Sequence, residues 1–438
     1  MRAELAERAQ QAVDRALAAG ADDVWAVAQQ SRDVEFSYRD GALEKVQDAT
    51  SRNLSVQVYS QGRYSSHQTT DLNPDRLGSF LDQAVASTAA LEPDPYRAIT
   101  PSELFEHRPQ ANLDLVDSAV ATLEREQRLE WCMSLDAAAR NHENVISATA
   151  GIYDGSVAYA VASSNGFAGF RDATYCWLGT NVTLRDRGDR RASDGFYAGG
   201  THVADLPGAR AVAETALDRA LVRLDADQGP TTRTTMLVDS RAASSLVERL
   251  LQSAYARSVQ QGRSFWSNLQ GRKAFSDKLT LVDEPLIRRG LGSRLFDDEG
   301  IAAGRLPLVE AGIVRDIYVD TYYGRKADMR PTTGSPSNVT VGPGELSLEE
   351  LVSDVGEGIY VTSWLGGNAD GTTGDFSLGL RGHVIENGVI GRPVGEMNVT
   401  GNLRKLFGRL ELTGSDVYPY ATILSPSLVF TGVDFSGA

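Results

Sequence analysis

The segment that decides the fold is Val34-Glu35-Phe36-Ser37-Tyr38-Arg39-Asp40-Gly41, near the beginning of the chain. Apolar and polar residues alternate over its first five positions, and its last three residues are typical of a β-hairpin turn. The chain can return over residues 43–46, and the alternation recurs at Leu54, Val56 and Val58. This pattern predicts antiparallel strands early in the chain.

Helical periodicity occurs on both sides of these strands. Apolar residues recur every four positions from Leu5 to Leu17, as on one face of a helix, and Gly20 ends the pattern. Farther along, Asn73-Pro74 is a suitable N-cap and first residue for a second helix. Residues 1–92 are therefore predicted to form an N-terminal α+β unit.

The rest of the chain divides at a proline-rich segment and at a Gly-Pro pair near residue 229. Residues 93–110 contain four prolines and no periodicity, which indicates a linker. Residues 111–227 carry a long helical pattern over 115–140, then strand patterns and a last helix, and are predicted to form a middle α+β unit. Residues 228–438 consist mainly of short strands and glycine-rich turns. The predicted fold class is α+β, with a strand-rich, barrel-like C-terminal domain.

Composition narrows the classes of function. Acidic residues outnumber basic ones by 58 to 43, and the formal net charge of −15 repels phosphate backbones. No stretch approaches the roughly 20 apolar residues of a membrane helix. The first twenty residues lack the apolar segment of a signal peptide. We therefore expect a cytoplasmic protein that binds neither nucleic acid nor membrane.

Residues that commonly bind metal ions are scattered along the chain. No two histidines lie within five residues of each other, so no helical histidine pair is available for zinc. Cys132 and Cys176 are too few and too far apart for a disulfide framework or a cysteine-based metal site. The acidic segment 297–300 is interpreted as a solvated turn, with cation binding as the alternative. The histidines are His67, His107, His142, His202 and His383.

The most glycine-rich loop, residues 366–374, does not match a nucleotide-binding motif. It lacks both the Gly-Lys-Ser/Thr ending of a P-loop and the G-x-G-x-x-G spacing. We interpret it as a turn where a peptide or another chain approaches the backbone closely. Asp375, Ser377 and His383 follow within nine residues and suggest an alternative hydrolase site. No glycine stands two positions before this serine, however, as it does in a nucleophile elbow.

Several motifs, in order, resemble the TldD/PmbA family, the metallopeptidases also called modulators of DNA gyrase. The resemblance extends over nearly the whole chain, which makes it more specific than any single motif. The stretches that carry it are Arg39-Asp40-Gly41, Glu44-Lys45-Val46, Thr70-Asp71-Leu72, Phe296-Asp297-Asp298-Glu299-Gly300, Gly366-Gly367-Asn368, Thr373-Gly374-Asp375-Phe376-Ser377, Ile385-Glu386-Asn387-Gly388 and Thr400-Gly401-Asn402-Leu403.

The resemblance implies one of two branches of this family. TldD-like chains carry a His-Glu-x-x-x-His helix and a later cysteine that bind a metal, usually taken as zinc. TldE-like chains, also called PmbA, lack these ligands and pair with a TldD subunit. Here the corresponding positions are Val247, Glu248 and Gln252, and no cysteine follows Cys176. Valine offers no lone pair and an amide is a poor zinc ligand. The resemblance therefore implies a TldE/PmbA-type subunit without catalytic or metal-binding residues, with zinc in the TldD-like partner.

The family also implies a substrate class, namely extended or unfolded peptides, in leader-peptide removal and small-protein degradation. Candidate residues for the substrate cavity are Asn368, Thr373, Asp375 and Ser377, whose alternative role is to stabilise turns. Two other functions remain open at this point. One is a stand-alone, homodimeric peptide-binding or scaffold protein. The other is a partner of an amide hydrolase in natural-product maturation.

Overall fold

The computed structural model describes residues 1–437, and its first half is built on one antiparallel sheet. The predicted hairpin is confirmed, because Asp40 and Gly41 both have positive φ and join the first two strands. The sheet has the strand order β3-β2-β1-β4-β5-β6. Its strands are β1 (Asp23–Arg39), β2 (Ala42–Ser60), β3 (Arg63–Thr69), β4 (Val145–Ser163), β5 (Ala168–Arg185) and β6 (Arg191–Gly200).

The pairing of β1 with β4 extends this sheet across the proposed linker 93–110. Strands from the predicted N-terminal and middle units therefore share one set of backbone hydrogen bonds. The boundaries 1–92, 111–227 and 228–438 stay predictions, since a continuous sheet does not itself define where independently folding units end.

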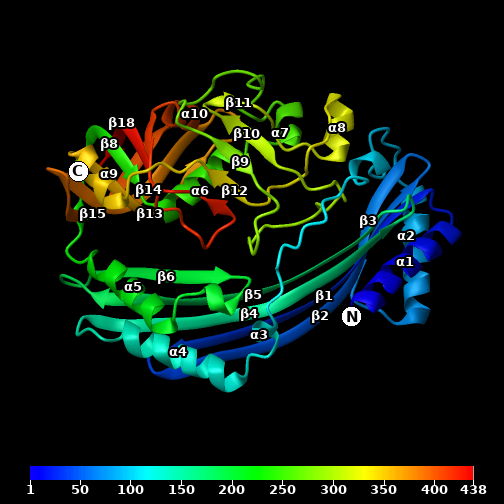
Figure 1. Ribbon diagram of the computed structural model, residues 1–438, viewed down its shortest axis with the longest axis horizontal. Helices are drawn as coiled ribbons and strands as arrows, with labels where there is room; N and C mark the ends of the chain where they lie inside the picture. Colours follow the sequence, from blue (N-terminus) through cyan, green and yellow to red (C-terminus); the bar gives the residue numbers. More distant parts are fainter. Residues whose placement is uncertain (438) are drawn as a thin grey trace.

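Helices cover the convex face of this curved sheet (Figure 1). The helices α1 (Arg2–Ala18) and α2 (Pro74–Ala89) lie at one end, and α4 (Arg125–Ala139) and α5 (Ala209–Leu221) lie at the other. The apolar face predicted for α1 is buried against the sheet, where Leu5 and Val13 pack with Val24. The predicted N-cap is also confirmed, because the Asn73 side chain accepts a hydrogen bond from the Asp75 amide. Within residues 1–437, no helix is long and apolar enough to span a membrane.

The single long helix predicted over residues 115–140 is wrong. The structure has a short helix, α3 (Ser118–Ala121), then an irregular segment, and α4 begins only at Arg125. The Leu115 carbonyl accepts a hydrogen bond of 2.9 Å from the Thr174 amide on the sheet. Asp117 caps α3 by accepting from the Ala119 amide. These tertiary and capping contacts override the helical periodicity of the segment.

The C-terminal half contains a closed five-stranded barrel, which confirms the barrel-like domain predicted from the sequence. The ring closes because β18 pairs with both β8 and β15. Two short strands, β7 (Asp227–Gln228) and β16 (Leu410–Thr413), extend the sheet. The barrel strands are β8 (Thr232–Val238), β13 (Gly358–Ala369), β14 (Asp375–Glu386), β15 (Val389–Asn402) and β18 (Leu428–Ser436).

A third, five-stranded sheet packs beside the barrel and shares its hydrophobic core. The hairpins at Ala311-Gly312 and Asn387-Gly388 have the same positive-φ turn, as their similar sequences suggest. The strands of this sheet are β9 (Leu281–Asp283), β10 (Leu306–Glu310), β11 (Ile313–Val314), β12 (Val339–Val341) and β17 (Ile423–Leu424). The helices of the C-terminal half are α6 (Ser240–Leu251), α7 (Ala256–Gln260), α8 (Thr321–Ala327), α9 (Leu348–Val355) and α10 (Leu403–Phe407), with 3-10 turns in the chain at η1 (Ser102–Leu104) and η2 (Val203–Asp205).

The C-terminal half lies over the concave face of the N-terminal sheet (Figure 1). At one end, the Phe167 ring lies 4.9 Å from Trp25 and 5.2 Å from Phe296, measured between ring centroids. At the other end, Arg241 of α6 donates to the Gly195 carbonyl at 2.8 Å, and the Tyr418 hydroxyl donates to the Tyr197 carbonyl. The two halves therefore meet at both ends of the concave face.

Candidate functional site

The concave face of the sheet carries glycines beside aromatic side chains. The strand register pairs Gly151 with Gly179 and Gly179 with Tyr197. The neighbouring row pairs Tyr153 with Trp177. Residues that are directly paired across antiparallel strands point to the same face of the sheet. The two rows thus form a shallow aromatic channel in which the Tyr197 ring covers Gly179 and the Trp177 ring covers Gly199, while no side chain covers Gly151.

A groove of about 360 Å³ lies along these rows. A Cβ atom on Gly179 would stand 1.9 Å from the Tyr197 ring, so only glycine allows this ring to lie against the sheet. Tyr153 and Tyr197 still expose 42% and 41% of their surface, which leaves both rings accessible to a ligand. The lining residues are Glu35, Phe36, Ser37, Thr149, Ala150, Gly151, Ile152, Tyr153, Trp177, Leu178, Gly179 and Tyr197.

An anionic residue is fixed beside this groove. The Tyr153 hydroxyl donates to Asp33 at 2.8 Å, and the Tyr175 hydroxyl donates to the same carboxylate oxygen. Burial opposes ionisation of Asp33, but hydrogen bonds from Tyr175, Tyr153 and Ser31 together lower its pKa. The Tyr153 and Tyr175 rings stack with centroids 5.2 Å apart. The groove therefore offers aromatic contact and fixed negative charge, which suits binding of a polypeptide.

The residues predicted to line a substrate cavity lie elsewhere, where β13 joins β14. Asn368 and Ser377 are exposed and directly paired across these strands. The Thr373 hydroxyl accepts from the Asp375 amide at 3.1 Å, and the Asp375 carboxylate accepts from Asn402 at 2.9 Å. The hydrogen bonds from Asn402 and Thr373 lower the pKa of Asp375. These contacts are those of a stabilised turn, and a cavity-lining role for the four residues stays a prediction.

The positions predicted to correspond to the metal motif do not form a group of metal ligands. Val247 on α6 is fully buried in the core, whereas Glu248 and Gln252 are exposed. In the described part of the chain, no three His, Cys, Asp or Glu residues are grouped so that they could hold a metal ion. Cys132 and Cys176 are buried free thiols, and burial raises the pKa of each to about 12. The residues present therefore do not fit a metallopeptidase zinc site.

The alternative hydrolase site at Asp375, Ser377 and His383 is not assembled. All three residues lie on the single strand β14, and the six-residue separation of Ser377 from His383 corresponds to about 20 Å. His383 is 6% exposed, and its Nε2 atom lies 3.0 Å from the Val222 carbonyl oxygen. Burial lowers the pKa of His383. The strand therefore keeps the serine and histidine too far apart for proton transfer.

The acidic segment 297–300 forms the turn that the sequence indicates, but only Asp298 of its three acidic residues is exposed. Asp297 is 4% exposed and accepts hydrogen bonds from the Ile301 amide at 2.9 Å and the Gly334 amide at 3.0 Å. Glu299 accepts from both the amide and the hydroxyl of Thr321, and burial raises its pKa to about 7. The protein's own hydrogen-bond donors therefore occupy both carboxylates.

Sequence reasoning missed the aromatic groove. Its signal is the spacing of glycine and aromatic residues at Gly151/Tyr153, Trp177/Gly179 and Tyr197/Gly199. Each pair is separated by one residue, so both members face the same side of a strand. The three pairs become neighbours only because of the way β4, β5 and β6 are aligned in the sheet, and no local sequence pattern specifies that alignment.

Comparison with known proteins gives matches to one family over most of the chain. Three family models match consecutive parts of the chain. These are PmbA/TldA metallopeptidase domain 1 at residues 26–88, the central domain at 119–224 and the C-terminal domain at 231–437. The metalloprotease PmbA of Escherichia coli O157:H7 is 26% identical over 426 residues, which cover 96% of this chain and 94% of that protein.

Solved structures agree with the family models. A putative modulator of DNA gyrase from Bacteroides thetaiotaomicron has 34% identity and a TM-score of 0.95, and the match covers 99% of this chain and 98% of that one. TldE from Thermococcus kodakarensis has the same fold, with a TM-score of 0.88 at 16% identity over 98% of this chain and 100% of that one. The chain therefore belongs to the PmbA/TldD family of metallopeptidase-like proteins.

Proposed function

We propose that this chain is the noncatalytic, TldE/PmbA-type subunit of a cytoplasmic, heterodimeric metallopeptidase that cleaves unfolded or extended peptides. The observation that carries the proposal is the lack of a metal-ligand group within residues 1–437 of a chain from a metallopeptidase family. Val247 packs in the core where a zinc-binding histidine is expected. A TldD-like partner would supply the zinc and its activated water.

The free edge of β2 supports association with a second subunit. The strand β3 pairs only with residues 54–60 of β2, so residues 42–53 pair with β1 alone and leave one edge open. Residues 42–52 are all exposed. A long unpaired edge strand is a template for association with another chain. This edge also suits the second candidate, a homodimeric peptide-binding or scaffold protein, and the partner assay at the end of the Discussion separates the two.

The concave groove supports a role in holding the substrate. Its aromatic walls and glycine floor accommodate an extended peptide, whose alternate side chains would contact the Tyr153 and Tyr197 rings. This chain would thereby bind and orient the peptide, and the partner would cleave it. If the natural substrate is another amide, as in natural-product maturation, this chain would likewise bind it and the partner would cleave it.

Filling the groove tests this role. Gly151→Val places a branched side chain on the groove floor, where a Cβ would meet only the Phe36 carbonyl oxygen at 3.8 Å. We expect the Kd of the assembled pair for an unfolded peptide to rise about tenfold, which corresponds to about 1.4 kcal/mol. Fluorescence anisotropy of a labelled peptide measures this change. The control is Gly304→Val, at a position with open space outside the groove. Equal affinities for both variants would exclude the groove as the peptide site.

A further inference from the structure

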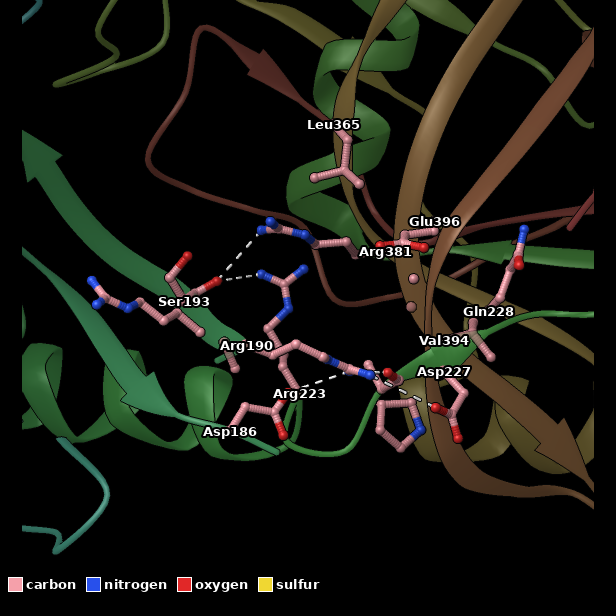
Figure 2. A pocket seen from close by; sticks show the side chains of 16 residues that line it. Asp186, Arg190, Ser193, Arg223, Asp227, Gln228, Leu365, Arg381, Val394 and Glu396 are labelled. Atoms are coloured by element: carbon pink, nitrogen blue, oxygen red, sulfur yellow. Dashed lines mark hydrogen bonds and ion pairs between the residues drawn. The ribbon is translucent and has the colours of Figure 1, made fainter. Parts of the chain in front are cut away.

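A second cavity, of about 410 Å³, lies where the barrel meets the edge strand β6, and four arginines are among the residues that line it (Figure 2). Arg191 comes from β6, Arg223 follows α5, and Arg381 comes from β14. Figure 2 shows Arg223 and Arg381 both directed at the Ser193 carbonyl oxygen, which accepts from them at 2.7 and 3.4 Å.

Positive charge exceeds negative charge beneath this cavity. The carboxylate of Asp194 lies 2.9 Å from Arg223, 3.4 Å from Arg241 and 3.9 Å from Arg219. One carboxylate therefore faces three guanidinium groups. Burial lowers the pKa of Arg223 to about 10. The positive charges of Arg381, Arg219 and Arg241 also lower this pKa, whereas the Asp194 carboxylate raises it. The buried Nε of Arg219 has no hydrogen-bond acceptor in the described chain.

Two arginines of the cavity wall have donors available for a ligand. The Arg381 side chain makes one long hydrogen bond, to the Ser193 carbonyl, and no ion pair within residues 1–437. Arg191 is exposed and likewise forms no ion pair in that range. Arg190, in contrast, lies 3.3 Å from Asp186 and 3.8 Å from Asp227, so its charge is already compensated. Three acidic residues line the cavity: Asp186 and Asp227 face Arg190, and Glu396 lies on the barrel side.

The cavity and the aromatic groove border the same strand. Ser193, at the cavity, and Tyr197, at the groove, are four residues apart on β6, which corresponds to about 13 Å. An extended peptide spans a similar distance with four residues. A peptide whose aromatic side chain lies on Tyr197 would have to pass beside the Arg241–Gly195 contact to place a carboxylate near Arg381, about four residues away.

We propose that this cavity binds a carboxylate of the peptide, with Arg381 and Arg191 as direct ligands and Arg223 as a positioning charge. The planar guanidinium fork matches the two oxygens of a carboxylate. The proposal rests on the proposed function, because it names a feature of the substrate. It predicts a preference for peptides that carry an acidic residue or a free C-terminus about four positions beyond an aromatic residue.

The test measures binding of a labelled peptide with an aromatic residue four positions before a C-terminal glutamate. The control peptide has glutamine there and an amidated C-terminus. We expect the acidic peptide to bind the full-length chain, alone or paired, about tenfold more tightly, and we expect added salt to reduce this difference. Arg381→Gln and Arg191→Gln should each remove most of the difference. Arg257→Gln, at an exposed arginine on α7, should not.

Each outcome decides the proposal. Equal binding of the two peptides would overturn it. So would an unchanged preference for the acidic peptide in both the Arg381→Gln and the Arg191→Gln chains, provided that both variants unfold at the same temperature as the parent chain. Competition by glutarate or inorganic phosphate without any peptide preference would assign the cavity to a free small anion and would also overturn it. These results leave the proposed function intact, since zinc-dependent cleavage by the mixed subunits is a separate measurement.

Discussion

Replacing Arg128 by methionine is expected to lower the free energy of unfolding by about 3–5 kcal/mol. Arg128 of α4 donates to both oxygens of Asp154 on β4, at 2.7 and 2.6 Å. The two side chains are only 4% and 1% exposed. Methionine keeps most of the side-chain volume but leaves the Asp154 carboxylate buried without its counter-ion. Urea denaturation followed by circular dichroism measures the loss.

The chain offers a matched control for this variant. Arg32 makes the same two-pronged contact with Asp48, but these side chains are 40% and 51% exposed. Arg32→Met should therefore change stability by about 1 kcal/mol or less. The double change Arg128→Met with Asp154→Leu should recover much of the loss, because it removes both buried charges. Similar losses for Arg128→Met and Arg32→Met would contradict the account of a buried ion pair.

Gly300→Ala is expected to lower the free energy of unfolding by about 2–5 kcal/mol, as the sum of backbone strain and overpacking. Gly300 has φ of +84°, and an added Cβ would lie 2.5 Å from the Trp25 ring and 3.1 Å from Phe167. These rings form the contact between the concave sheet and the C-terminal half. Thermal unfolding and the near-ultraviolet circular dichroism of the aromatic side chains measure the effect.

Gly304→Ala is the control for this change. Gly304 lies four residues farther along the same segment, and an added Cβ there meets no atom within 4 Å. Its substitution should leave stability and the aromatic signal nearly unchanged. Equal stability of Gly300→Ala and this control would contradict the tight packing of Gly300 against the Trp25 and Phe167 rings. Because that contact fixes the barrel over the groove, Gly300→Ala should also weaken peptide binding.

Local chemistry explains which parts of the fold were predictable. The Asp40-Gly41 turn requires positive φ at two successive residues, which few residue types tolerate, so the sequence identifies the hairpin. Likewise, Ser347 and Glu350 form the reciprocal hydrogen bonds of a capping box at the start of α9. Short strands separated by glycine-rich turns indicated the barrel. Each of these features depends on residues close together in the chain.

The functional surfaces depend instead on long-range register. The groove combines residues from β1, β4, β5 and β6, and its floor needs Gly151 and Gly179 to be paired. The arginine cavity joins residues 191, 223 and 381, which belong to three separate elements. No spacing rule links such positions. From the sequence, the substrate cavity is therefore predicted at the glycine-rich stretch 366–374 and the residues beside it. Residues 366–369 of that stretch belong to strand β13, and the residues after them form a turn held by Asp370 and Asn402.

The break between α3 and α4 has a similar origin. The apolar spacing over residues 115–140 fits a single helix, yet Leu115 and Asp117 take part in hydrogen bonds with Thr174 on β5. Apolar periodicity indicates which side chains are buried, but it does not indicate which backbone groups form hydrogen bonds with another helix or strand. A helix boundary fixed by a distant strand is therefore hard to predict from one sequence.

The measurement that tests the central claim most directly combines metal analysis with a peptidase assay. This chain, a TldD-like subunit and their equimolar mixture are each assayed for bound zinc and for cleavage of an unfolded peptide. We predict no stoichiometric zinc in this chain, a stable complex in the mixture, and chelator-sensitive cleavage that requires both subunits. Stoichiometric zinc together with cleavage by this chain alone would contradict the account.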